Sequence, residues 1–334
     1  MTEPRGAAEP VPCTLLGGFL GAGKTTLLNH ILTHGGQRIA VVVNDFGDVS
    51  IDDALIVRRD DTRIVLDNGC ICCSVRGDLI EGVRGLLLET PPPQRIVVEM
   101  SGIADPGAVT RTFRLMERRW PLQLDGVIAV VDAEHFPEEG AEYYVLARDQ
   151  LALADLVILN KCDLVAEPEL AALESRLRGY VPHARLVRTC RAEVPLQVLL
   201  GIGAGRPQGD EETHAGHEFR THTVRISEAL SLEALRRVCT ELPASVFRVK
   251  GFVFLAERPE QRMVLQIVGR RAQIALDRPW GDEPRQTTLV CVGSRELDAS
   301  ALSSLFASTV AGPAPPTAPF TGAVQWLRRR LSSR

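Results

Sequence analysis

The sequence predicts an α/β fold class: a mostly parallel sheet with helices on both faces, followed by a smaller α+β domain. At 334 residues the chain is too long for one compact core and suits two domains. Over its first part, short apolar runs alternate with helical stretches, which is typical of βαβ units in a parallel sheet. Residues 201–218 then lose this periodicity and gain Gly, Pro and charge, which indicates a linker.

The first domain opens with an apolar strand, a glycine-rich turn and a helix. Later apolar runs are too short for helices and predict buried parallel strands. These strands are expected at 38–44, 94–100, 124–132 and 154–160, with helices near 75–89, 106–119, 141–153 and 167–178.

The second domain mixes strand and helix patterns without the regular alternation of the first. Strands are expected at 219–226, 246–256, 262–268 and 286–292, and helices at 231–241 and 298–307. The segment "VQWLRRRL" could form a short amphipathic helix, although a solvated tail is the favoured interpretation. The predicted organisation is a disordered N-terminus (1–10), the first domain (11–205), a linker with sparse histidines (206–218), the second domain (219–310) and a Pro/Ala-rich, basic tail (311–334).

Charge and composition exclude several classes of function. The net charge of -4 argues against bulk binding to nucleic acid or anionic membranes. No apolar run approaches the roughly 18 to 20 residues of a spanning helix, and the start has no apolar signal-peptide region. We therefore expect a cytoplasmic protein. Its eight cysteines should be mostly reduced there, which favours metal or thiol chemistry over disulfides.

The strongest motif is "GFLGAGKT" at residues 18–25, a full match to G-x-x-x-x-G-K-[ST] between an apolar strand and a helix. Backbone N–H groups of such a loop surround phosphates, which predicts a P-loop NTPase. Lys24 is expected to reach the β- and γ-phosphates, and the Thr25 hydroxyl to bind Mg²⁺. The predicted phosphate-binding residues are Gly18, Gly21, Ala22, Gly23, Lys24, Thr25 and Thr26.

Lysine usage supports this assignment. The chain has 38 Lys plus Arg, but its lysines are only Lys24, Lys161 and Lys250. An arginine-preferring genome explains the bias, yet two of these lysines fall inside nucleotide motifs. A compact ammonium reaching a phosphate cannot be replaced by a planar guanidinium.

The base is predicted from "NKCD" at 160–163, an N-K-x-D motif directly after a buried strand. The Asp163 carboxylate can accept from N1–H and N2–H of guanine, a donor pair that adenine lacks. If adenine bound in place of guanine, a buried Asp163 carboxylate would be left without hydrogen-bond partners. A site of this kind can reject the wrong base by a factor of roughly 10⁴. With Asn160 and Lys161 completing the motif after a P-loop, the expected nucleotide is GTP.

Two loops are expected to sense the γ-phosphate, because strand ends beside a P-loop line the site. One is "VNDFGDVSIDD" (43–53), which contains Asp45. The other is "VVEMSGIADP" (97–106), in which Glu99 is placed near Mg²⁺ or the attacking water and the Gly102 N–H near the γ-phosphate. Lys24, Glu99 and Asp45 are the predicted catalytic residues.

Between these loops lies "CICC", with thiols at Cys70, Cys72 and Cys73. Cys70 and Cys72 share one face of an extended segment, and Cys73 can join them where a helix begins. Thiolates at a helix N-terminus have depressed pKa values and form a soft site for Zn²⁺, Co²⁺, Ni²⁺ or Cu⁺. A fourth ligand must come from water, Asp45, a histidine or another protein, so the site is open, unlike structural zinc sites. A redox pair and a bend lined with buried thiols are the alternatives.

The remaining cysteines and histidines are given structural interpretations. Cys162 is expected to pack near the base, and His30 and His34 to lie on a helix face. Auxiliary metal contact and a polar linker are equally weighted for His214, His217 and His222, and Lys250 is as readily a surface charge as a specific contact. Small core residues are expected at Cys13, Cys190, Cys239 and Cys291.

Taken together, "GGFLGAGKTTLLNHIL", "VVNDFGDVSID", "NGCICCSVRGDL", "VEMSGIADP" and "NKCDL" resemble, in this order, the CobW-like metallochaperone GTPases. "RVKGFVFL" and "TTLVCVGSRELD" resemble the C-terminal domain of that family, so the resemblance covers roughly residues 11–310. It implies a Mg·GTP-dependent protein that binds a transition metal and passes it to a client. The residues that match family motifs are Lys24, Thr25, Cys70, Cys72, Cys73, Glu99, Asn160 and Asp163.

The sequence departs from the pattern of the family in three places. Asp45 stands where many members have Glu, and Val43 where some have a carboxylate. The histidine-rich loop of many members is reduced to "THAGHEFRTH", which puts metal storage by that loop in doubt.

The resulting hypothesis is a GTPase that binds Zn²⁺, with Co²⁺ or Ni²⁺ as alternatives, when GTP orders its loops, and releases the metal on hydrolysis. The expected partner is a client metalloprotein or an enzyme of cofactor biosynthesis, docked on the C-terminal domain, and a homodimer is possible. Two rival hypotheses are a regulatory GTPase with a structural or redox-sensing cysteine cluster and a small-molecule kinase; N-K-x-D argues against the kinase.

Overall fold

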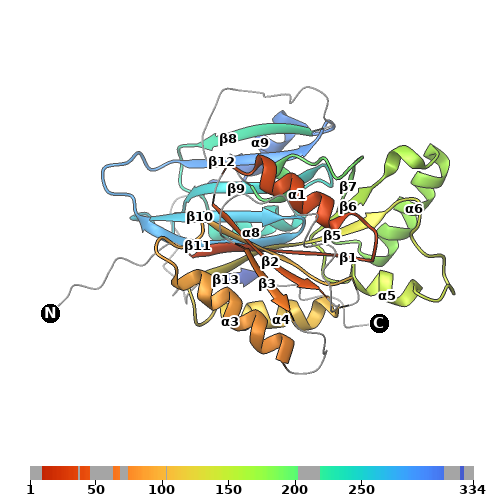
Figure 1. Ribbon diagram of the computed structural model, residues 1–334. Helices are drawn as coiled ribbons and strands as arrows, with labels where there is room; N and C mark the ends of the chain where they lie inside the picture. The colour runs from red at the N-terminus through yellow and green to blue at the C-terminus, as the bar shows by residue number, and fades with distance from the viewer. Residues whose placement is uncertain are drawn as a thin grey trace, which may run out of the picture. The chain divides into compact units, whose positions relative to one another are not determined.

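The chain folds into two compact units, Met1–Val194 and Pro195–Arg334, each with its own sheet (Figure 1). This computed structural model describes residues 10–36, 38–45, 63–67, 74–102, 104–201, 219–311 and 324–326. Among these residues, no helix is both long and apolar enough to cross a membrane.

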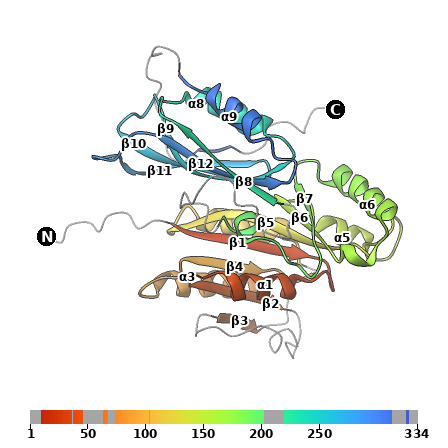
Figure 2. The same cartoon turned by 90° about the horizontal axis from the view of Figure 1, so that it is seen from above.

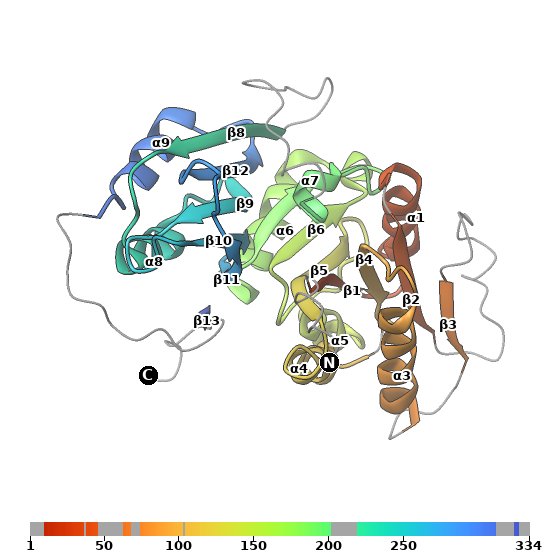
Figure 3. The same ribbon diagram turned by 90° about the vertical axis from the view of Figure 1, so that its left-hand side faces the viewer.

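The first unit is built on a seven-stranded sheet of order β3-β2-β4-β1-β5-β6-β7, and all its strand pairs are parallel. β1 lies in the centre and β3 at one edge, beside β2 (Figure 3). Because the strands are parallel, their carboxyl ends share one edge of the sheet, where ligands of such folds bind. The strands are β1 (Val11–Gly18), β2 (Ile39–Asp45), β3 (Arg63–Asp67), β4 (Arg95–Glu99), β5 (Leu122–Asp132), β6 (Leu156–Asn160) and β7 (Arg185–Arg188).

Helices cover both faces of this sheet, as a parallel sheet of apolar strands requires. α3 (Ser74–Leu88) and α4 (Pro106–Met116) bury apolar side chains in one core with β1, β2 and β4. α5 (Tyr144–Asp149) and α6 (Glu167–Tyr180) do the same with β5, β6 and β7. α1 (Lys24–His34) lies across the opposite face from α3 and α4 (Figures 1 and 3).

The second unit is a six-stranded antiparallel sheet of order β13-β11-β10-β9-β12-β8. Two amphipathic helices, α8 (Leu232–Glu241) and α9 (Ala299–Ala307), pack on one face of it (Figure 2), and Ser231 and Asp298 cap their N-termini. The other elements are α7 (Leu196–Leu199), β8 (Phe219–Ile226), β9 (Val246–Phe254), β10 (Gln261–Val268), β11 (Arg271–Pro279), β12 (Thr287–Ser294) and β13 (Val324–Trp326).

The predicted fold class is confirmed, and the expected strands and helices are present with ends shifted by a few residues. The sequence reading missed β3, β7 and β11. β7 has only two apolar residues between arginines, and β3 and β11 have only three in a row, so none of them forms the longer apolar run that marked the central strands. Both interpretations of "VQWLRRRL", the favoured solvated tail and the amphipathic helix, are wrong at Val324–Trp326, which pairs with β11 as a strand.

A buried ion pair crosses the centre of the first sheet. The guanidinium of Arg95 donates to Asp125 Oδ2 at 2.6 Å, and the two side chains are 3% and 1% exposed. Removing one partner of such a pair leaves a desolvated charge without compensation. We expect Asp125→Asn to lower the free energy of unfolding by about 3–5 kcal/mol. Urea denaturation would measure the change, and a loss below about 1 kcal/mol, the range of exposed ion pairs, would contradict it.

Candidate nucleotide-binding site

The P-loop connects β1 to α1, as the motif predicted, and close packing requires two of its glycines. Gly18 has φ +134, and a Cβ there would lie 2.2 Å from the carbonyl oxygen of Val130 in β5. Gly23 has φ +101, and a Cβ there would lie 2.5 Å from Asn160 Nδ2. Both positions combine a left-handed conformation with a neighbour that leaves no room, so any side chain would displace the loop.

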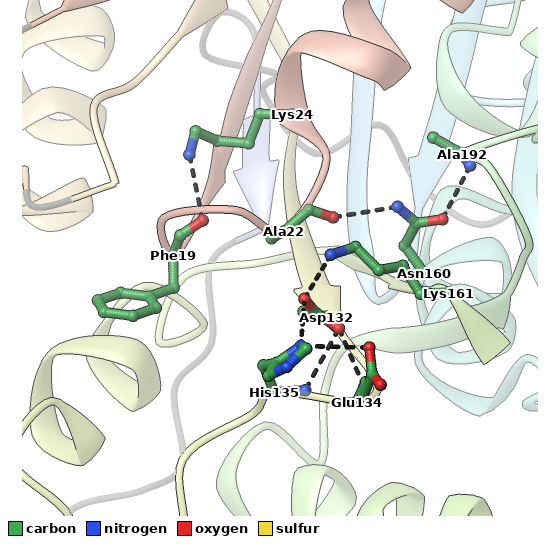
Figure 4. Close-up of polar contacts among 9 residues, drawn as sticks. All are labelled: Phe19, Ala22, Lys24, Asp132, Glu134, His135, Asn160, Lys161 and Ala192. Atoms are coloured by element: carbon green, nitrogen blue, oxygen red, sulfur yellow. Dashed lines mark hydrogen bonds and ion pairs between the residues drawn. The ribbon is translucent and has the colours of Figure 1, made fainter. Parts of the chain in front are cut away.

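Lys24 and Thr25 begin α1 and turn toward the loop. Lys24 is 9% exposed, and its Nζ donates to the Phe19 carbonyl at 3.2 Å (Figure 4). The Thr25 hydroxyl donates to Glu99 Oε1 at 3.4 Å. A hydroxyl and a carboxylate this close offer the hard oxygen ligands that Mg²⁺ prefers, so these two residues fit the predicted ion.

The loop after β4 lies directly against the P-loop. Glu99 ends β4 and is 5% exposed. A Cβ on Gly102 would lie 2.9 Å from the backbone nitrogen of Leu20, which places this second loop beside the phosphate loop. The structure therefore brings Lys24, Thr25, Glu99 and Gly102 together at the carboxyl ends of β1 and β4.

The sequence reading missed Gln150, which joins the two loops. This side chain at the end of α5 is 1% exposed. Its Oε1 accepts from Gly18 N at 3.4 Å, and its Nε2 donates to Ala104 O at 2.6 Å. The sequence does contain a clue to this role, because Gln150 lies in the mostly apolar stretch "DQLALADL" and a buried amide needs hydrogen-bond partners.

Asn160 links the base motif to the P-loop. The side chain is 2% exposed; its Nδ2 donates to the Ala22 carbonyl at 3.0 Å, and its Oδ1 accepts from Ala192 N at 2.8 Å (Figure 4). One amide thus holds together the P-loop, the end of β6 and the loop that follows β7. Asn160 was predicted to recognise the base, and the structure shows that it also connects these three segments.

Asp163 lies in the short 3-10 helix Cys162–Leu164 and is exposed, although the specificity argument expected a buried carboxylate. None of the residues of this short turn is buried. Cys190, in the loop after β7, is also exposed, so its expected place in the core is wrong. Partial burial first, and hydrogen bonding to Asp163 second, raise the pKa of the Cys190 thiol.

Lys161 has φ 63 and pairs with Asp132, a residue that the sequence reading also missed (Figure 4). The distance between Lys161 Nζ and Asp132 Oδ2 is 2.6 Å. Burial opposes ionisation of Asp132, but hydrogen bonds from Lys161 and from the Glu134 N–H outweigh it and lower the pKa of this carboxyl. The sequence does contain a clue to this role, because Asp132 is an acidic residue at the end of a long apolar strand.

The cysteine motif and most of the first loop lie outside the described residues. β3 ends at Asp67 and α3 begins at Ser74, so Cys70, Cys72 and Cys73 belong to the connection between them. Asp45 ends β2 in register with Asp67, but its side chain is not described. His214 and His217 also fall outside the described residues.

The other thiols and imidazoles have structural roles. Cys13, Cys239 and Cys291 are buried as expected; burial raises the pKa of Cys13 and Cys291, and that of Cys239 to about 12. Cys162 is half-buried, and burial raises its pKa to about 11. The helix-face interpretation of His30 and His34 is confirmed, since their rings bond the carbonyls of Val194 and His30 at 2.9 and 3.0 Å. His222 lies in β8, with Nε2 at 2.8 Å from Ser303 Oγ.

The fold and this site define a P-loop protein with a guanine-type base motif. Residues 12–188 match the family described as CobW/HypB/UreG, nucleotide-binding domain, and residues 219–310 match the cobalamin synthesis protein cobW C-terminal domain. The chain belongs to this family, which confirms the resemblance and the prediction that the protein is a GTPase.

Individual relatives agree along most of the chain. The zinc chaperone CobW of Pseudomonas aeruginosa is 35% identical over 361 residues, which cover 92% of this chain and 94% of the relative. The zinc chaperone YjiA of Escherichia coli is 34% identical over 306 residues, covering 85% and 94%. The crystal structure of Zn(II)-bound YjiA GTPase from E. coli is 28% identical, with a TM-score of 0.42, and covers 91% of this chain and 100% of that chain.

Proposed function

We propose that this protein is a GTP-hydrolysing metallochaperone that binds Zn²⁺ through Cys70, Cys72 and Cys73 and releases it to a client metalloprotein or cofactor pathway. One observation carries the proposal: the cysteine connection between β3 and α3 leaves the same sheet edge as the P-loop and Glu99. In register, Asp45 of β2 pairs with Asp67 of β3, and Val43 of β2 pairs with Glu99 of β4. β3, the strand that leads into the motif, is therefore two strands away from β4, which carries Glu99.

Different residues of the chain have different proposed roles in the hydrolysis of GTP to GDP and phosphate. The P-loop N–H groups and Lys24 bind the β- and γ-phosphates, and Thr25 and Glu99 would hold Mg²⁺. That ion, when bound, neutralises charge that develops on the phosphate oxygens. Glu99 and the Gly102 N–H lie where they can orient water and the γ-phosphate, and Asp45 is the candidate from the first loop. Asn160, Lys161 and Asp163 hold the guanine.

Metal control would follow from the shared edge. The γ-phosphate orders the loops at 44–53 and 99–106, and this order brings the thiolates into ligating positions. Loss of the phosphate relaxes them, and the Zn²⁺ leaves as cargo. Zinc is favoured because similar proteins are named zinc chaperones, and soft thiolates accept Co²⁺ and Ni²⁺ as well. The client would dock on the antiparallel sheet unit, and a homodimer is a further proposal.

Metal titration in two nucleotide states tests this function. We expect the protein with a non-hydrolysable GTP analogue to bind Zn²⁺ about 5- to 150-fold more tightly than the protein with GDP, the usual range of coupling between two sites. Competition against a chromophoric chelator would measure both affinities. Replacing Cys70, Cys72 and Cys73 by Ser should abolish the tight site, whereas Cys239→Ser, which removes a thiol from α8 of the second unit, should keep its stoichiometry.

Equal affinity in the two nucleotide states would refute the proposed coupling. Tight zinc in both states, or no zinc in either, would instead favour a regulatory GTPase with a structural or redox-sensing cluster. Phosphate transfer to a small acceptor instead of water would indicate the kinase.

A further inference from the structure

The base motif is anchored by a carboxylate from a neighbouring strand. Asp132 is the last residue of β5 and pairs in register with Asn160, the last residue of β6. Lys161 follows at once, and its ammonium lies 2.6 Å from Asp132 Oδ2. The P-loop residue Ala22 is tied to Asn160 on the other side of the same motif.

The carboxylate of Asp132 is itself fixed. Its side chain is 10% exposed, and Oδ1 accepts from the backbone N–H groups of Glu134 at 3.0 Å and His135 at 3.3 Å. Oδ2 thus meets Lys161 from a group that cannot rotate without losing two further hydrogen bonds. Figure 4 shows these contacts converging on Asp132.

The backbone of Lys161 is fixed as well. It adopts φ 63, its carbonyl accepts from Leu164 N at 3.1 Å, and the following Cys162 N donates to Thr189 O at 3.2 Å. Because both its backbone and its ammonium are held, the four-carbon stem of Lys161 can adopt only a few rotamers. Free lysine stems are among the most mobile side chains, so this restraint is a substantial preorganisation.

We propose that Asp132 is a positioning residue for guanine nucleotides: it binds the Lys161 ammonium so that the apolar stem is already set beside the base. The proposal rests on the proposed role of residues 160–163 in binding guanine. Asp132 acts through Lys161 and touches no reacting atom.

The test compares Asp132→Asn, Lys161→Met and the double variant. Because only binding is preorganised, we expect Asp132→Asn to weaken binding of fluorescent GDP about tenfold and to raise KM for GTP, with kcat at saturating GTP unchanged. Methionine keeps an apolar stem but has no ammonium to hold. In that background Asp132→Asn should cause no further loss, which a double-mutant cycle measures.

Glu174→Gln is the matched control. Arg188 and Glu174 also pair at 2.6 Å, with side chains 32% and 16% exposed, against 32% and 10% for Lys161 and Asp132. The control removes an equivalent carboxylate from the same unit and should leave GDP affinity unchanged. The proposal would be overturned if Asp132→Asn and Glu174→Gln lost the same GDP affinity. It would also be overturned if the losses of Asp132→Asn and Lys161→Met were additive in the double variant. Lys161→Met leaves Asp132 in place and tests the ammonium separately: if this variant binds GDP as the unmodified protein does, the proposal is overturned even where Asp132→Asn fails to fold.

Failure of the base assignment would look different. If Asp163→Asn left GTP preference intact, residues 160–163 would not read guanine. If Asp163→Asn changed the preference while Asp132→Asn bound GDP as the unmodified protein does, only the role of Asp132 would be refuted.

Discussion

Replacing Asp163 by Asn is expected to reverse the base preference of the protein from guanine to xanthine. The carboxylate accepts two hydrogen bonds from N1–H and N2–H of guanine, and an amide facing the same edge would oppose a donor to a donor. Xanthine carries a carbonyl at C2, which the amide N–H can satisfy. Because rejection of a mismatched hydrogen-bond pattern can reach roughly 10⁴, the ratio of kcat/KM for GTP to that for XTP should fall by a factor of this order.

Competition between unlabelled GTP and XTP for a fluorescent nucleotide, together with hydrolysis rates, would measure the change. Asp149→Asn supplies a control, since Asp149 is likewise an exposed aspartate of the first unit, 55% exposed and paired with Arg148 on its own helix. The control should keep the GTP preference. An unchanged GTP-to-XTP ratio in Asp163→Asn would mean that the base is read elsewhere.

Replacing Lys24 by Ala is expected to lower the rate of GTP hydrolysis by roughly 10² to 10³, the loss that follows removal of one preorganised donor to developing charge. Lys24 is 9% exposed and its ammonium already lies within the loop, 3.2 Å from the Phe19 carbonyl. Lys24→Arg should not restore the rate, because a planar guanidinium does not fit a position shaped for a compact ammonium.

Single-turnover hydrolysis at saturating GTP and Mg²⁺ would measure both variants. Lys250→Arg makes the same chemical change in β9 of the second unit, outside every nucleotide motif, and should hydrolyse GTP at the normal rate. Normal hydrolysis by Lys24→Ala would contradict the assignment of the P-loop.

Contiguous motifs were readable from the sequence because their chemistry is encoded locally. The P-loop needs glycines, a lysine and a hydroxyl at fixed spacing, and the structure places Lys24 and Thr25 at the start of α1 as that spacing requires. Central strands could be predicted because burial on both faces favours a run of apolar residues, as in "LVIL" of β6. The edge strand β7 was not, since only two apolar residues lie between its arginines.

Cys190 shows why the burial of a residue could not be predicted from its neighbours in sequence. Cys190 lies close to the two apolar residues of β7 and was interpreted as a core residue, yet it begins a loop and contacts Asp163. Asp163 in turn is exposed by the 3-10 turn that carries it. In both cases exposure depends on which way the chain turns after a strand, and hydrophobic pattern does not specify that direction.

By itself the sequence determined the fold class, the family and the nucleotide motifs, and it predicted which residues contact phosphate and base. Only the tertiary structure decided how these motifs are held: Gln150 between the P-loop and the loop after β4, Asn160 between Ala22 and Ala192, and Asp132 on Lys161. The physical reason is distance along the chain. A motif's own spacing follows from one strand and one helix, whereas these hydrogen bonds join residues separated by 29 to 138 positions, which only the packing of the sheet brings together.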